Sequence, residues 1–196
     1  MFSERLEKQL EFIAEIDKLK GIKRQTLLIN EDRQENDAEH SWHFAVLAML
    51  LSEYCDEEIN MLKVMKMALV HDIVEIDAGD TYCYDKEGYK TKADREERAA
   101  RRIFSILPED QYEAFYGLWR EFEDMNTPEA KFAAVLDRLQ PLLLNYRKGG
   151  VSWKNHGTCR SQVEERNQCV KNSSEELYRY IMHIIEDACE KGMLKK

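Results

Sequence analysis

Two histidine-bearing segments hold the residues of this sequence that are best suited to bind a metal ion. In the segment LVHDIVE, His71 is followed directly by Asp72, and Glu75 lies one helical turn further on. Side chains at this spacing can share one face of a helix. The surrounding residues are apolar, and a buried carboxylate without a partner costs several kcal/mol. Because a divalent cation satisfies an imidazole nitrogen and a carboxylate oxygen together, the pair indicates a metal site rather than a buried structural histidine.

Two distant positions extend this candidate site. His40 lies in AEHSWH, at the start of another apolar segment, and Asp137 lies within AAVLDRLQPLLL. The alternative for Asp137 is a salt bridge to Arg138 or to a neighbouring helix. Pro141 removes the amide that would bond to the Asp137 carbonyl. Since the apolar pattern continues through LLLNY, we expect a kink in this helix rather than a break.

The composition predicts an all-α fold that carries these residues on long helices. The 196 residues include only eight glycines and three prolines, too few to separate many short strands. Hydrophobic residues make up 43% of the chain, too many for a disordered one. At about 150 residues per domain, we expect one domain. We predict about eight helices, at residues 3–20, 36–54, 59–76, 92–107, 108–125, 127–148, 160–171 and 174–191, with loops at 22–36, 77–92 and 151–159.

Charge and hydropathy exclude several classes of protein. The net charge of −9 argues against binding to polymeric DNA or RNA but leaves room for a local basic pocket that holds one phosphate ester. The longest apolar run, residues 44–51, is far shorter than the roughly 20 residues that span a bilayer. The five cysteines contain no CxxC pair and fit free thiols in a reducing compartment. We therefore expect a cytoplasmic protein that is not bound to a membrane.

Four segments resemble, in order, the HD-domain phosphohydrolase superfamily, and within it the bacterial 5′-deoxynucleotidases and their eukaryotic HD-domain relatives. These segments are Arg24, RQENDAEHS (33–41), HDIVEIDAGD (71–80) and KFAAVLDRL (131–139). The resemblance implies a compact all-α helical bundle that forms a homodimer. It also implies a single HD domain over residues 1–196, with a core at 22–145 and C-terminal helices at 160–191 that pack on it.

The resemblance assigns roles residue by residue. The positions that match metal ligands are His40, His71, Asp72 and Asp137. The positions that match catalytic acidic residues are Glu75 and Asp80, and those that match substrate-binding basic residues are Arg24 and Arg33. The chain departs from the bacterial deoxynucleotidases at Gln25, where those enzymes carry a tryptophan, so a preference for deoxyribose over ribose is not implied. His43 either supports the site or is structural.

The implied activity is that of a metal-dependent phosphoric monoester hydrolase. It would remove phosphate from (deoxy)nucleoside 5′-monophosphates by attack of a metal-bound water. Glu75 would accept the proton and Asp80 would orient the water or assist the leaving oxygen, or the two roles are exchanged. Mixed nitrogen and oxygen ligands favour Mn²⁺, Co²⁺, Fe²⁺ or Zn²⁺ over Mg²⁺. The absence of histidine between Asp72 and Asp137 favours one metal ion over a multi-metal centre.

Two alternative functions remain at this point. One is a nucleotide pyrophosphatase or deoxynucleoside triphosphate hydrolase, which needs more basic residues around the phosphates than Lys23, Arg24 and Arg33 supply. The other is a non-catalytic nucleotide or metal sensor. The presence of Glu75 and Asp80 beside the metal ligands argues against a sensor.

Overall fold

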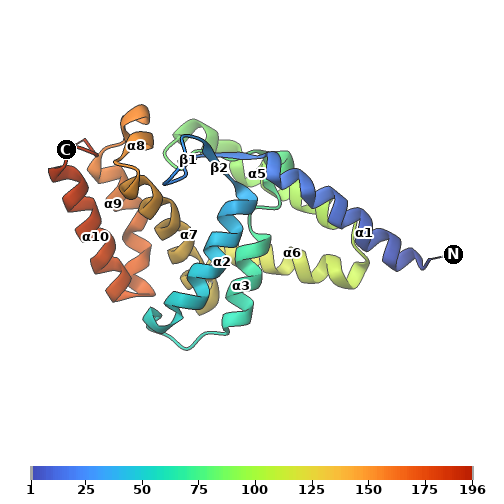
Figure 1. The fold of residues 1–196 in the computed structure, drawn as a ribbon. Coiled ribbons are helices and arrows are strands. Elements are labelled where there is room, and N and C mark those ends of the chain that lie inside the picture. The colour runs from blue at the N-terminus through green and yellow to red at the C-terminus, as the bar shows by residue number, and fades with distance from the viewer. Residues whose placement is uncertain (1, 196) are drawn as a thin grey trace.

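The chain folds into a helical molecule with one small antiparallel ribbon, which confirms the predicted all-α fold (Figure 1). The computed structural model describes residues 2–195. The helices are α1 (Glu4–Ile16), α2 (Asp37–Leu51), α3 (Met61–Val70), α4 (Glu75–Ala78), α5 (Lys86–Phe104), α6 (Glu109–Asp124), α7 (Pro128–Arg147), α8 (Val151–His156), α9 (Arg160–Asn167) and α10 (Glu175–Glu190). None of the helices described between residues 2 and 195 is long and apolar enough to span a bilayer.

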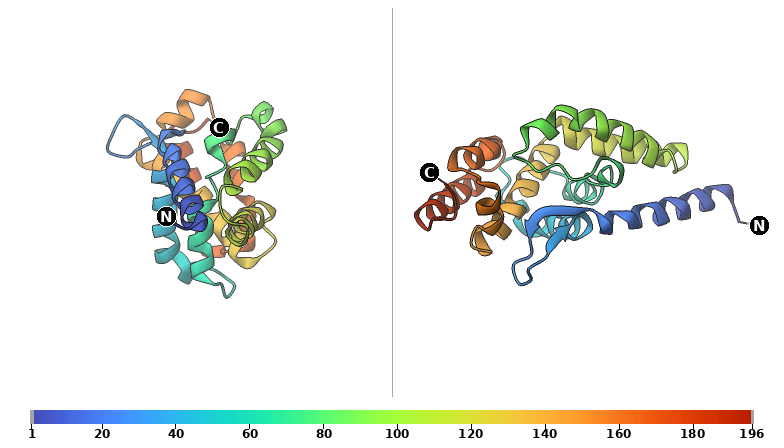
Figure 2. Two further views of the ribbon diagram at one scale, coloured as in Figure 1. Left: turned by 90° about the vertical axis from the view of Figure 1, so that its right-hand side faces the viewer. Right: turned by 90° about the horizontal axis from the view of Figure 1, so that it is seen from above.

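Helix α7 lies at the middle of the molecule and divides it into two parts. Helices α2 and α3 pack against α7, and α8, α9 and α10 lie at the C-terminal end (Figure 1). Helices α1, α5 and α6 extend toward the opposite end, where the N-terminus lies (Figure 2). Segments that are far apart in the sequence therefore meet around α7.

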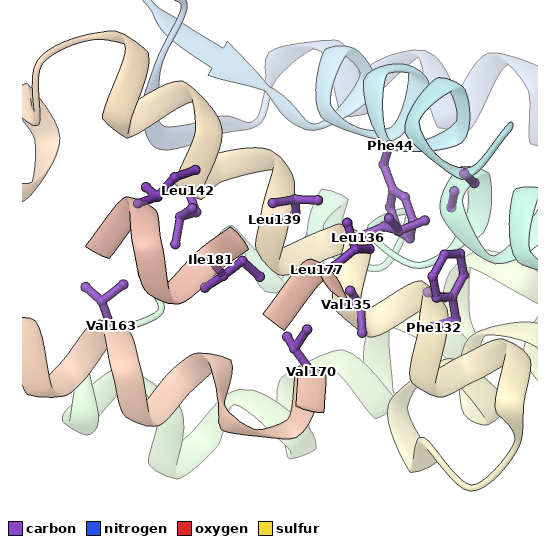
Figure 3. Close-up of a cluster of buried hydrophobic side chains, with 14 of the residues drawn as sticks. Phe44, Phe132, Val135, Leu136, Leu139, Leu142, Val163, Val170, Leu177 and Ile181 are labelled. Atoms are coloured by element: carbon purple, nitrogen blue, oxygen red, sulfur yellow. The ribbon is translucent and has the colours of Figure 1, made fainter. Parts of the chain in front are cut away.

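Two clusters of buried apolar side chains hold these parts together. In the first, Leu136 and Leu139 of α7 lie between Phe44 of α2 and the C-terminal helices, which contribute side chains such as Ile181 (Figure 3). The second cluster joins α1, α5, α6 and the end of α3, and in it the ring of Phe104 contacts those of Phe12 and Phe115. Burial of apolar surface at about 25 cal/mol per Å² stabilises both clusters.

The segment 22–36, predicted as a loop, contains an antiparallel ribbon instead. Strand β1 (Lys23–Leu27) pairs with β2 (Gln34–Asn36), and Lys23 lies opposite Asn36. The ribbon is polar, but it packs against α7 and α8, and Ser152 donates a hydrogen bond to the Gln25 carbonyl. These tertiary contacts are invisible in the local sequence, so the loop prediction was wrong here.

The helix predicted at 59–76 is interrupted at the His-Asp pair. Helix α3 ends at Val70, and the following turn bonds Ile73 N to Val70 O and Glu75 N to Asp72 O. These bonds span three residues rather than four, which tightens the turn. The expectation that one regular helix carries the whole HDxxE pattern was therefore wrong.

Other boundaries differ at short or capped elements. Helix α5 starts at Lys86 rather than 92 because Asp85 caps it, and α8 occupies part of the predicted loop at 151–159. The six residues of α8 are too few to show periodicity, and buried Trp153 anchors them. Helix α7 continues through Pro141 to Arg147, so it does not break, as expected.

Candidate metal centre

Four predicted ligands from three parts of the chain meet in the interior. His40 is on α2, His71 and Asp72 follow α3, and Asp137 is on α7. The Nε2 atom of His40 lies 3.1 Å from Oδ1 of Asp137. The Nε2 atom of His71 lies 3.1 Å from Oδ1 of Asp72 and 3.8 Å from Oδ1 of Asp137. The structure thus brings all four side chains to one point, although long stretches of sequence separate them.

The Nδ1 atom of each of the two imidazoles already forms a hydrogen bond. His71 Nδ1 donates to the Ala68 carbonyl at 3.0 Å, and His40 Nδ1 donates to Gln140 Oε1 at 3.0 Å. In a neutral imidazole the Nε2 atom then carries a lone pair and acts as an acceptor. Burial is the main influence that lowers the pKa of His40, which favours this neutral form.

The Nε2 atoms of both histidines therefore face carboxylate oxygens, and no proton lies between them when the imidazoles are neutral. Burial lowers the pKa of His71, but the charge of Asp72 outweighs it and the pKa is raised, so a proton competes with a metal ion at this position. His71 Nε2 is buried and has no hydrogen-bond partner among the described residues. Two acceptors at 3.1 Å repel each other unless a cation lies between them, and such a donor set fits a divalent metal ion. His40, His71 and Asp72 also offer ligand atoms that lie within 4.8 Å of one another. The four residues fit the metal that the sequence predicted.

Gln140 orients His40 and was missed in the sequence. Its side chain is fully buried, and its Nε2 donates to Glu35 Oε1 at 2.6 Å and to His43 Nδ1 at 3.0 Å. This fixes the amide oxygen toward His40, so the network sets which imidazole nitrogen faces the metal site. The available signal was a glutamine inside an apolar helical stretch, three residues after Asp137.

A second group of acidic side chains surrounds Arg24. Arg24 Nη1 donates to Asp72 at 2.7 Å and lies 3.3 Å from Asp37. Burial raises the pKa of Asp37 to about 7, and the charge of Asp72 adds to this effect. Burial and the same neighbour raise the pKa of Glu75 well above its usual range. Ionised Asp37 and Glu75 are therefore disfavoured here. Asp37 was missed in the sequence, although it lies next to the histidine motif.

A pocket of about 240 Å³ opens beside the four ligands. Its wall includes Asp80, for which burial raises the pKa, together with Arg24, Gln25 and Glu75. The other side of the wall is formed by residues 81–84 and by residues of α5, α8 and α9. The predicted catalytic carboxylates thus lie together with the ligands at one cavity.

The structure does not bring Arg33 to this pocket. Its guanidinium is exposed and forms ion pairs with Glu31 at 2.8 Å and with Glu39 at 2.7 Å. Glu39 also caps α2 together with Asn36, as the sequence predicted. In this structure Arg33 therefore stabilises the start of α2, and its predicted contact with substrate is not supported by its position.

Comparison with known proteins identifies the class to which this site belongs. The family model of the HD domain matches residues 16–178, so the chain belongs to the HD domain family.

Two relatives with which the chain aligns are named as 5′-deoxynucleotidases. The chain is 34% identical to human 5′-deoxynucleotidase HDDC2 over 135 residues, which are 68% of this chain and 65% of the relative. It is 33% identical over 144 residues to 5′-deoxynucleotidase HDDC2 of Dictyostelium discoideum, with 70% of this chain and 75% of the relative covered. The match thus spans slightly less than two thirds of the human relative.

One solved structure is similar over the whole chain. The crystal structure of a predicted metal-dependent phosphohydrolase from Magnetospirillum magnetotacticum MS-1 is 46% identical, with a TM-score of 0.94, and the alignment covers 99% of this chain and 100% of that one. This similarity extends to the C-terminal helices.

Proposed function

We propose that this protein is a metal-dependent phosphomonoesterase that removes the phosphate from (deoxy)nucleoside 5′-monophosphates. The observation that carries the proposal is the buried set of two imidazoles and two carboxylates, whose donor atoms fit a divalent cation, beside a pocket. The 5′-deoxynucleotidase names of the relatives support the nucleotide substrate. Because the match covers 65% of the human relative, the nucleotide substrate is a proposal for this chain.

His40, His71, Asp72 and Asp137 would hold the metal ion. When bound, a divalent ion lowers the pKa of a coordinated water and neutralises negative charge on the phosphate. Two imidazoles and two carboxylates support Mn²⁺, Co²⁺, Fe²⁺ or Zn²⁺, whereas Mg²⁺ prefers oxygen ligands. The hydrogen bonds of the two imidazoles keep both Nε2 atoms available as ligands.

Glu75 and Asp80 would move protons during the reaction. Glu75 would accept a proton from the attacking water in its ionised form, which burial disfavours and which the positive charges of Arg24 and of a bound metal ion would favour. Asp80, at the pocket wall, would orient that water or assist the leaving nucleoside oxygen, or the two residues exchange these roles. Arg24 would hold the phosphate from β1 and at the same time orient Asp72.

Location and assembly form a second part of the proposal. We propose a cytoplasmic homodimer, in which residues 1–196 form one HD domain with a core at 22–145. The first apolar cluster supports one domain because it contains residues from Phe44 to Leu194. Large exposed apolar side chains support a dimer; they are Leu10, Ile13, Trp42, Met49, Leu50, Leu62 and Leu69 on α1, α2 and α3. Light scattering on the purified protein tests the mass.

A substrate panel tests the reaction itself. The protein is stripped of metal, reloaded with Mn²⁺ or Co²⁺, and supplied with nucleoside mono-, di- and triphosphates that contain ribose or deoxyribose. We expect phosphate release from the monophosphates alone. Release of pyrophosphate or triphosphate supports the alternative enzyme class, and no turnover at full metal occupancy supports the sensor. Because Gln25 lines the pocket, the ribose series shows whether the sugar is discriminated.

A further inference from the structure

The pocket contains four cationic side chains, and they differ in what they already bind. They are Arg24, Lys92, Arg138 and Arg166. Arg24 donates hydrogen bonds to the carboxylates of Asp72 and Asp37. Lys92 forms an ion pair with Glu96 at 2.8 Å. These two charges are therefore largely neutralised by carboxylates before any ligand enters.

Arg138 is held by other groups. Its Nη1 donates to the Ala134 carbonyl at 2.7 Å, and its Nε donates to the Arg166 carbonyl at 3.2 Å. Arg138 directly follows Asp137 on α7. The second bond therefore ties the last turn of α9 to the helix that carries a metal ligand.

Arg166 is the cation with the fewest partners. Within residues 2–195 its guanidinium forms no ion pair with a carboxylate, and its one hydrogen bond runs from Nη1 to the Tyr89 hydroxyl at 3.4 Å. The side chain is only partly exposed and lines the pocket. Because arginine stays protonated at any pH of interest, Arg166 supplies a positive charge that no described carboxylate contacts directly.

The charge of Arg166 influences the pKa of two other groups that line the pocket, those of Cys83 and Asp137. Burial raises the pKa of Cys83, and the charge of Arg166 is the strongest influence that lowers it. Burial opposes ionisation of Asp137, but His40, His71 and, less strongly, Arg166 outweigh it and hold the pKa of Asp137 well below its usual range. Arg166 thus lies within electrostatic range of a metal ligand, although it comes from α9.

The charge balance of the site leaves a role for such a cation. The buried or pocket-lining carboxyl groups around the centre include those of Glu35, Asp37, Asp72, Glu75, Asp80 and Asp137. A phosphate monoester adds a charge of about −1.5 to −2 at pH 7. Since Arg24 is already shared between Asp72 and Asp37, its charge alone does not balance this group. A free guanidinium with a planar fork of donors matches phosphate oxygens well.

We infer that Arg166 binds the phosphate group of the substrate, and that the C-terminal helix α9 thereby supplies part of the substrate site. This inference rests on the proposed function for the identity of the substrate. Arg138 acts as a positioning residue, because its bond to the Arg166 carbonyl fixes the last turn of α9 beside Asp137.

The test measures binding of inorganic phosphate to the Mn²⁺-loaded protein by titration calorimetry, after the metal content has been measured. We expect Arg166→Gln to weaken phosphate binding about tenfold or more, since a charge-assisted hydrogen bond is lost. Arg166→Lys keeps the charge and should lose less. A matched control is Arg160→Gln on the same helix, because Arg160 forms an ion pair with Glu164 and does not line the pocket. It should leave phosphate binding unchanged.

Several outcomes would overturn the inference. They are wild-type protein that does not bind phosphate, an unchanged dissociation constant in Arg166→Gln, and an equal loss in Arg160→Gln. Weaker binding of an unphosphorylated nucleoside with unchanged phosphate binding would also overturn it, by placing Arg166 at the nucleoside end. Turnover separates the two proposals. If phosphate binding depends on Arg166 but no nucleotide is hydrolysed, the proposed reaction fails and the phosphate site stands.

Discussion

The metal centre and the apolar cluster between α1, α5 and α6 are both buried, but they are built in opposite ways. In the cluster, Phe12, Ile103 and Phe104 are at most 4% exposed and contact one another through apolar surface. In the metal centre, buried polar atoms of Glu75 and His71 lack hydrogen-bond partners among the described residues. Burial stabilises the first region by itself, whereas the second costs free energy until a cation satisfies it.

The apolar cluster therefore contributes to stability by itself, whereas the metal centre contributes to function and depends on a ligand. The apolar cluster needs no ligand, so its contribution to the free energy of unfolding should not depend on metal. The metal centre should stabilise the protein only when a cation is bound.

Asp72→Ala should have the largest effect. Because Asp72 lies between both histidines and Arg24, we expect loss of metal binding and of all activity. In wild-type protein, metal at a hundredfold excess over its dissociation constant should add about 2.7 kcal/mol to the free energy of unfolding, and a chelator should remove it. The variant should show no such increment. Metal analysis and thermal unfolding measure both effects, and normal turnover would refute the ligand assignment.

Glu75→Gln should keep the metal but lower turnover by about 10²- to 10⁴-fold, since the proton acceptor is lost. The metal-free variant should also be more stable than wild type at neutral pH. The raised pKa of Glu75 means that its stability contribution is present at low pH and is lost as the pH rises and the carboxyl group ionises. Denaturant unfolding against pH checks this, and a variant with equal turnover would contradict the assignment.

Phe104→Ala tests the other region. The side chain is fully buried, so its removal should cost about 3–5 kcal/mol of unfolding free energy. The increment from added metal should stay at its wild-type value. Urea unfolding with and without metal measures the two quantities together. A lost metal increment would show that the regions are coupled.

Gln140→Leu should weaken metal binding by about ten- to a hundredfold, because His40 loses the partner that orients it. Exposed Gln168 offers a control, and Gln168→Leu should leave the metal affinity unchanged. Calorimetric titration with Mn²⁺ measures both variants. Equal affinities would mean that packing alone orients His40.

Arg33→Gln should have the smallest effect. Its ion pairs are exposed, and such pairs contribute about 0–1 kcal/mol, so stability should hardly change. We also expect an unchanged KM, since Arg33 lies outside the pocket lining. Steady-state kinetics with a nucleoside monophosphate decide the question. A large rise in KM would contradict this prediction and show that Arg33 takes part in substrate binding.

Much of the fold could be read from the sequence, and the four side chains predicted as ligands lie close together in the structure, while their binding of a metal ion stays a prediction. The apolar periodicity gave the long helices, and the capping box at Asn36 was confirmed. Polar residues within apolar stretches, such as Asp137, predicted the position of the metal site. The β1–β2 ribbon and α8 were missed, because contacts with α7 rather than local pattern stabilise them.

The sequence by itself determined that histidines and carboxylates lie in apolar segments, a pattern that predicts a shared cation. The tertiary structure decided which side chains reach that cation and its pocket. It excluded Arg33 from the lining, added Gln140 as a hydrogen-bond partner of His40, and placed Arg166 of α9 in the lining of the same pocket as Asp72 and Asp137. The physical reason is distance along the chain. Local patterns set the conformation of each segment, whereas packing between segments far apart in the sequence sets which charges meet.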